Sequence, residues 1–102
     1  MKEYDIFVPL SYNDGTSIEA FKLQRIQARL LDHFEGLTYF PQPNEGVWRF
    51  GEVVYRDAVV IYRVITRDAV ASRRFLEIFK TDLKRDLQQL EVLTVEREIG
   101  LI

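Results

Sequence analysis

Arginine, carboxylate and aromatic side chains occur close together between residues 48 and 63, and these types could bind a small molecule. On adjacent strands they would form a polar cluster able to hold an acidic or aromatic ligand. The alternative is a set of cross-strand ion pairs, each worth roughly a few tenths of a kcal/mol. The candidate ligand-binding residues are Trp48, Arg49, Arg56, Asp57, Tyr62 and Arg63.

Two glycines in the same region match the spacing of a nucleotide-binding loop, but the rest of that motif is missing. Gly46 and Gly51 are separated by four residues, as in G-x-x-x-x-G-K-[ST]. The lysine is replaced by Glu52, which would repel a triphosphate, and the hydroxyl residue by Val53. We therefore interpret Gly51 as a hairpin turn, with either a two-residue loop or a bulged three-residue loop.

The inventory of metal ligands and nucleophiles is small. The chain has no cysteine and one histidine, which excludes disulfides, cysteine-based zinc sites and two-histidine metal sites. The histidine, His33, is expected at the end of a helix, where its position favours a surface role. We expect no metal site and no cofactor, and no catalytic residue can be assigned from the sequence.

Length and charge restrict the class of protein. The 102 residues predict a single domain, residues 1–102. A formal net charge of −2 argues against nucleic acid as the main partner. The sequence contains no apolar run of the length that a membrane span needs, and its start lacks the pattern of a signal peptide. We expect a cytoplasmic protein that binds neither nucleic acid nor membrane.

Hydrophobic periodicity predicts six elements in the order βαββαβ. They are a strand over Tyr4–Tyr12, a helix from Thr16 to Gly36, two strands within Leu37–Thr66, a helix from Arg67-Asp68 to about Gln89, and a strand over Glu91–Ile99. This order is typical of an α+β, ferredoxin-like fold: a four-stranded antiparallel sheet of order 4-1-3-2, two helices on one face, and a long hairpin between the second and third strands. Pro41 and Pro43 suit the second strand because it lies at an edge.

The first helix has a predicted capping box. Thr16 is followed three residues later by Glu19, so each side chain could accept a bond from a free backbone N–H group. We expect the helix to begin within two residues of Thr16, and Thr16→Ala to cost roughly 1 kcal/mol. Leu23, Ile26 and Leu30 should form its buried stripe with Phe34.

The middle of the chain resembles a known kind of domain. Gly36-Leu37-Thr38, Gly46-x-Trp48-Arg49 and the segment from Gly51 to Arg56, followed by an apolar strand, are similar to small uncharacterised bacterial domains of ferredoxin-like type. This resemblance implies a fold and no activity. The architecture is also similar, more distantly, to the dimeric α+β barrels, which include monooxygenases and isomerases.

Apolar side chains on both faces of the first and third strands predict a homodimer. Two helices cover one sheet face, so the other would be a larger apolar patch than monomers usually expose. The expected interface residues are Phe7, Tyr39, Phe40, Trp48, Phe50, Tyr55 and Ile61. We expect Trp48→Ala to weaken dimerisation more than it destabilises the subunit.

Three function classes remain open. The sequence favours a small homodimeric binding or assembly domain. The alternatives are a small-molecule enzyme of the dimeric α+β barrel type and a regulatory module that binds a small ligand. A deep pocket with a titratable residue of shifted pKa would favour an enzyme.

Overall fold

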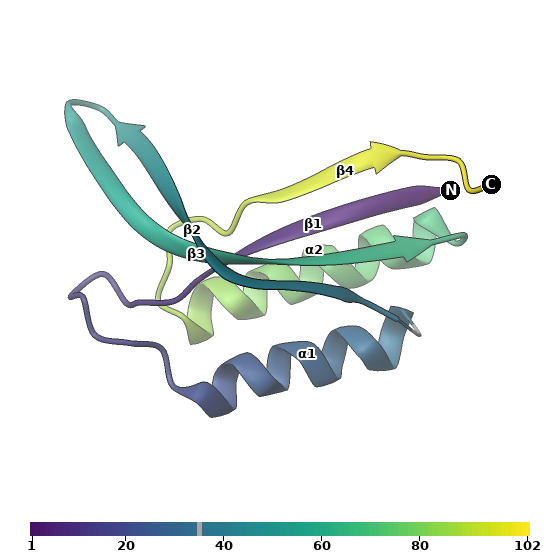
Figure 1. Cartoon of the computed structure of the whole chain (residues 1–102), viewed down its shortest axis with the longest axis horizontal. Helices are drawn as coiled ribbons and strands as arrows, with labels where there is room; N and C mark the ends of the chain where they lie inside the picture. The colour runs from purple at the N-terminus through teal and green to yellow at the C-terminus, as the bar shows by residue number, and fades with distance from the viewer. Residues whose placement is uncertain (35) are drawn as a thin grey trace.

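Six elements form one sheet and one layer of helices in the computed structural model, which describes residues 1–34 and 36–102. They are β1 (Lys2–Pro9), α1 (Ala20–Phe34), β2 (Thr38–Phe50), β3 (Val53–Thr66), α2 (Ala69–Asp86) and β4 (Thr94–Glu98). The antiparallel sheet has the order β2-β3-β1-β4, and both helices lie on one side of it (Figure 1). The predicted βαββαβ order, strand order and edge position of β2 are confirmed.

The core lies between the sheet and the two helices, and it follows the predicted periodicities. On β1, Tyr4, Ile6 and Val8 alternate toward the helices and are buried. The same cluster contains Val60, Tyr62 and Val64 of β3, Ile26, Leu30 and Phe34 of α1, and Leu76, Phe79 and Leu83 of α2. Leu23 packs against this cluster while remaining partly exposed. The sequence therefore identified the helix-facing side of each main element.

The start of α1 differs from the prediction. The helix begins at Ala20, and Thr16 lies in the preceding loop. Its backbone N–H and its hydroxyl both donate to Asp14 Oδ1, at 2.9 and 2.6 Å. The carboxylate of Glu19 accepts a hydrogen bond from the Tyr12 hydroxyl. The capping box is therefore absent, because the aspartate two residues before Thr16 binds its N–H group first.

The cap of α2 gives a stability prediction. The Asp68 side chain accepts a hydrogen bond from the Ala71 N–H group at 3.1 Å. Asp68→Ala is therefore expected to lower the free energy of unfolding by about 1 kcal/mol, measured by urea denaturation. Thr16→Ala is the matched control and should change it by less than about 0.5 kcal/mol. Equal effects of the two substitutions would contradict this assignment of the caps.

The hairpin between β2 and β3 changes register at its prolines. Tyr39 pairs with Tyr62 and Phe40 with Ile61, but the next pair is Asn44 with Val59. Pro41, Gln42 and Pro43 thus lie opposite a single residue, and two of the three have no N–H group to donate. β2 therefore has two more residues than β3 between these pairs. Because two is an even number, its side chains keep the same alternation of faces on both sides of the prolines. The loop is a two-residue turn in which Gly51 has φ 63°, a left-handed value that glycine adopts without strain.

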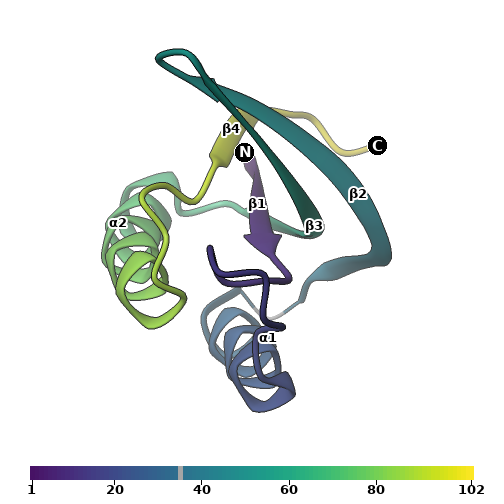
Figure 2. The same ribbon diagram turned by 90° about the vertical axis from the view of Figure 1, so that its left-hand side faces the viewer.

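The outer part of this hairpin, residues 44–58, projects from the rest of the molecule. We refer to it as the hairpin arm. Figures 1 and 2 show it rising on the side of the sheet away from α1 and α2. The longest dimension of the molecule is 41 Å. The direction in which the arm rises in both figures shows that it bends out of the plane of the sheet.

Candidate functional site

A buried carboxylate lies on the sheet face opposite the helices, which we call the uncovered face. Asp5 of β1 is 2% exposed. Its Oδ1 accepts a hydrogen bond from Arg63 Nε at 2.8 Å, and its Oδ2 accepts bonds from Arg63 Nη2 at 3.0 Å and Arg97 Nη1 at 2.9 Å. A two-point guanidinium–carboxylate pair is among the stronger and more directional contacts in proteins. We refer to Asp5, Arg63 and Arg97, with Glu3, as the Asp5 cluster.

Three strands assemble the Asp5 cluster. Asp5 pairs with Arg63 of β3 in the strand register, and Glu3 pairs with Arg97 of β4. Alternation places all four side chains on the uncovered face. Arg63 also forms an ion pair with Glu3, and its guanidinium lies 5.1 Å from the centre of the Phe40 ring. The cluster therefore contains two carboxylates and two guanidiniums with an aromatic ring beside them.

The electrostatics of the cluster keep Asp5 ionised. The hydrogen bond from Arg63 lowers the pKa of Asp5 below its ordinary value, and the bond from Arg97 acts in the same direction. Burial opposes them because it penalises the charged form. The side chains of Arg63 and Arg97 remain 36% and 43% exposed. The two arginine side chains are therefore the part of the cluster that solvent reaches most, and the two carboxylates balance their charge.

The six predicted ligand-binding residues do not form one cluster. The register places Trp48, Asp57 and Arg63 on the side of the uncovered face, and Arg49, Arg56 and Tyr62 on the opposite side. Tyr62 is buried in the core, where it stacks on Tyr39 with ring centroids 4.8 Å apart. Arg56 forms an exposed ion pair with Glu45 at 2.7 Å, as expected if these residues form cross-strand ion pairs and no binding site. Of the six, Arg63 is the one that belongs to the Asp5 cluster.

The predicted interface residues are more closely grouped. Phe7, Phe40, Trp48, Phe50, Tyr55 and Ile61 all lie on the side of the uncovered face according to the strand register. Tyr39 is the exception, because it faces the core side with Tyr62. Dimerisation itself remains a prediction.

Trp48 packs closely onto its own strand. The indole Nε1 is buried and has no hydrogen-bond acceptor among the described residues. A Cβ atom at position 46 would lie 3.4 Å from that nitrogen. The Trp48 indole therefore lies against the backbone at Gly46. The Gly46-x-Trp48 spacing thus coincides with a close contact within the arm.

No local sequence pattern points directly to Glu3, Asp5 and Arg97 as a site. Period-two alternation on the first strand does place Asp5 on the face opposite Tyr4 and Ile6. That Asp5 lies beside Arg63, 58 residues later in the chain, depends on the register between β1 and β3. The signal that could have identified the cluster is a charged residue, Asp5, among the apolar residues of an alternating strand.

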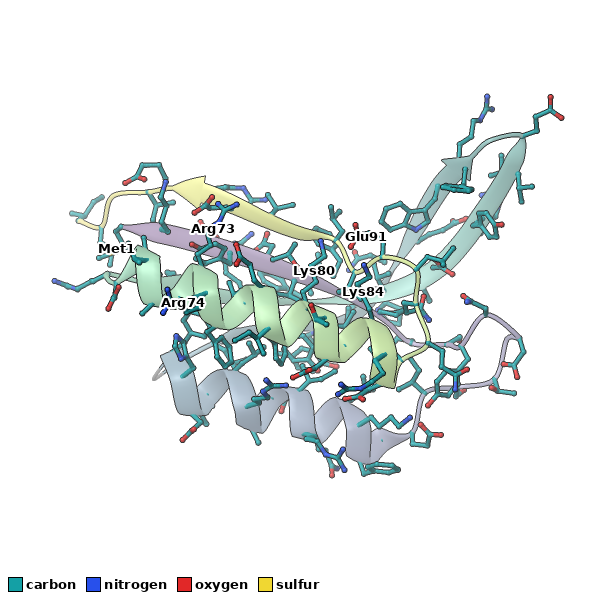
Figure 3. All side chains as sticks on the ribbon, turned by 180° about the vertical axis from the view of Figure 1, so that it is seen from behind. Met1, Arg73, Arg74, Lys80, Lys84 and Glu91 are labelled. Carbon is teal, nitrogen blue, oxygen red and sulfur yellow. The ribbon has the colours of Figure 1, made fainter. Side chains whose placement is uncertain are left out.

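A hollow of about 270 Å³ lies between α2 and β4. Figure 3 shows Arg73 and Lys80 on the side of α2 that faces β4, with Lys80 near Glu91. Arg73 contacts Glu96 at 3.0 Å, and Lys80 contacts Glu91 at 2.8 Å. Each of these cations already has a carboxylate partner. The side chains of Glu96 and Glu91 are 31% and 54% exposed, so these are ordinary surface ion pairs, in contrast to the buried carboxylate of Asp5.

Two classes of feature are absent from the described residues. No group of three or more histidine, aspartate or glutamate side chains in residues 1–34 and 36–102 is arranged to hold a metal ion. Within the same ranges, no helix is long and apolar enough to cross a membrane.

Comparison with known proteins shows a fold relationship. No family model matches the chain, and no curated protein matches it. Two solved structures are similar: a phage SAM lyase in complex with S-methyl-5'-thioadenosine (13% identity, TM-score 0.68) and a phage SAM lyase in the apo state (16% identity, TM-score 0.66). The similarity covers 95% of this chain and 80% and 79% of those chains. It shows a shared α+β fold over nearly the whole chain.

Proposed function

We propose that this domain is a small-molecule enzyme that binds its substrate at the Asp5 cluster. The observation that carries the proposal is the buried Asp5 carboxylate, held by two partly exposed arginines on the uncovered face. Burying a charged group is costly, and structures retain such groups where they are paired or where they act on a ligand. Similarity to a small lyase favours this enzyme interpretation over the assembly domain that the sequence favoured.

The cluster has unused capacity to bind a carboxylate. Each guanidinium carries five N–H donors, and Asp5 accepts two from Arg63 and one from Arg97. The remaining donors lie on side chains that solvent reaches. Asp5 thus fixes the arginines in position, and their outer N–H groups can bind a ligand carboxylate in the two-point geometry that arginine favours.

The ligand class follows from this chemistry and from the fold analogy. S-adenosylmethionine, the substrate we propose, carries a carboxylate, a cationic sulfonium and a flat adenine ring. Arg97 and Arg63 would bind the substrate carboxylate. Glu3 would lie near the positive charge of the sulfonium, and Phe40 offers an aromatic face to the adenine ring. A fold alone does not transfer an activity, so the assignment depends on these side chains.

The reaction we propose breaks a carbon–sulfur bond of the sulfonium. The bonding electron pair returns to sulfur, which becomes a neutral thioether, S-methyl-5'-thioadenosine. The carbon that loses sulfur takes an electron pair from the carboxylate of the substrate or from a neighbouring C–H bond whose proton leaves. Because the leaving group is neutral, the protein has mainly to orient the substrate and to exclude water, and the fixed charges of the Asp5 cluster can do the first.

The test is conversion of S-adenosylmethionine by the whole chain, followed by mass spectrometry. The wild type is expected to release S-methyl-5'-thioadenosine and to bind that compound in calorimetry. Arg97→Gln should lower kcat/KM about tenfold to a hundredfold, because a charge-assisted hydrogen bond is worth about 1.5–3 kcal/mol. Arg73→Gln, which removes the ion pairs of Arg73 with Glu77 on α2 and Glu96 on β4, away from the Asp5 cluster, is the matched control and should stay near wild type.

Two results would contradict the proposal. If the folded wild type neither binds S-methyl-5'-thioadenosine nor forms it, the proposed function is wrong. If the wild type is active and Arg97→Gln is equally active, the reaction does not take place at the Asp5 cluster. Circular dichroism of each variant distinguishes loss of activity from loss of folding.

A further inference from the structure

The hairpin arm exposes apolar side chains on both of its faces. Phe50 is 72% exposed, and Val53 and Tyr55 on the same face are 52% and 48% exposed. On the opposite face, Val47 and Val54 are 56% and 48% exposed. Trp48 adds a partly buried indole. The face of Phe50, Val53 and Tyr55 is the more apolar of the two, because Arg49 and Arg56 lie on the face of Val47 and Val54.

Such an arm lacks the support that a hairpin needs. A two-stranded hairpin alone is marginally stable in water, and it becomes stable when a third strand, a helix or another surface packs on it. The described helices lie on the other side of the sheet from the arm (Figures 1 and 2). A surface of this kind in a soluble protein marks an interaction site.

The second apolar surface is the part of the uncovered face that lies beside the Asp5 cluster. Phe7 and Ile61 lie opposite each other there, with Phe40 beside Ile61, and Ile65 is 40% exposed on the same face. It is continuous with the apolar side of the arm through β2 and β3. Each chain therefore brings one projecting arm and one open sheet face, and both need a covering partner.

We infer that the arm of one copy packs on the apolar part of the uncovered face of a second copy of this chain, around Phe7 and Ile61 and beside the Asp5 cluster. This exchange covers both surfaces at once and requires no other protein. Reciprocal exchange between two copies is its smallest closed form, because a two-fold axis brings the same patch of each chain to the other. Face-to-face sheets lie about 10 Å apart, which leaves room for interdigitating aromatic side chains.

The available area supports this occupant. Seven residues per strand at about 3.3 Å each, and two strands about 4.8 Å apart, give the arm a flat footprint of roughly 230 Å² per face. In reciprocal exchange each copy contributes its arm and the patch that the other arm covers, roughly twice that footprint. Projecting side chains increase the accessible area further, toward the ~800 Å² per partner of a stable complex.

This inference goes beyond the proposed function and is tested without any ligand. The experiment is light scattering after gel filtration of the whole chain at micromolar concentration. The expected mass is a multiple of the 12.1 kDa of one chain. Phe50→Glu puts a charge on the apolar surface of the arm and should shift the protein to one chain, with at least a tenfold weaker association.

Val70→Glu is the matched control, because Val70 is 82% exposed on α2, outside both surfaces. It should associate like the wild type. A wild-type mass of one chain, or association unchanged by Phe50→Glu, would overturn the inference. Circular dichroism establishes that both variants are folded. Turnover of S-adenosylmethionine is measured separately, so failure of association and failure of the proposed function give different results.

Discussion

Raising the pH from about 10 to about 12 is expected to unfold the domain, because two core tyrosines must stay neutral. Burial raises the pKa of Tyr62 to about 12 and is also the main cause that raises the pKa of Tyr4 to about 12. The next cause at Tyr4 is its hydroxyl, which donates to Glu96 at 2.9 Å. Both residues are at most 3% exposed.

The direction of this effect follows from proton linkage. An unfolded tyrosine loses its proton near pH 10, while the folded one retains it until about pH 12. The stabilisation is complete below pH 10 and is lost as the pH rises through that interval. A pKa difference of one is worth about 1.4 kcal/mol, so the two residues together contribute about 5 kcal/mol. That is comparable with the whole stability of a small domain, roughly 5–15 kcal/mol.

Urea denaturation at a series of alkaline pH values measures this loss, with Trp48 fluorescence as the probe. Tyr62→Phe removes one of the two ionisations and should reduce the slope of the free energy of unfolding against pH. Tyr55→Phe, at a half-exposed position on the hairpin arm, is the control. A wild-type free energy of unfolding that stays constant up to about pH 11.5 would show that neither tyrosine is held neutral by the fold.

Asp5→Asn is expected to lower the free energy of unfolding by about 2–3 kcal/mol at neutral pH. The variant keeps the shape of the side chain but removes the charge that accepts three hydrogen bonds from Arg63 and Arg97. Removing one partner of a buried pair costs about 3–5 kcal/mol, and partial exposure of the arginines reduces that cost here. Glu45→Gln breaks an exposed ion pair with Arg56 and should change stability by less than about 0.5 kcal/mol.

The difference between wild type and Asp5→Asn should decrease in acid. The folded pKa of Asp5 lies below its ordinary value because Arg63 donates to it. Its stabilisation is therefore complete above about pH 4 and is lost as the pH falls through the folded pKa. Other carboxylates are present in both proteins and cancel in the comparison. A difference that stays the same from neutral pH to about pH 2.5 would contradict a stabilising Asp5 carboxylate.

The sequence by itself determined the elements and their buried sides. Alternation on β1 and β3, and the apolar stripes at Ile26 and Leu30 and at Leu76 and Phe79, are local patterns. Each follows from the periods of strand and helix, so the helix-facing core could be predicted. The strand order could be predicted because the βαββαβ order is typical of one topology. The prolines at 41 and 43 agree with the edge position that this topology predicts, because a missing N–H group is a property of the residue itself.

Tertiary structure decided what depends on register and on competition between neighbours. The carboxylate of Asp14 accepts the hydrogen bond from the Thr16 N–H group that a helix cap would have used, and α1 begins at Ala20. The two extra residues at the prolines set which side chains face each other along the arm. Asp5, Arg63 and Arg97 come together because three strands distant in sequence pair in one register. No local pattern carries that information. The residues around a charged side chain do not reveal whether an oppositely charged residue lies across from it on a neighbouring strand.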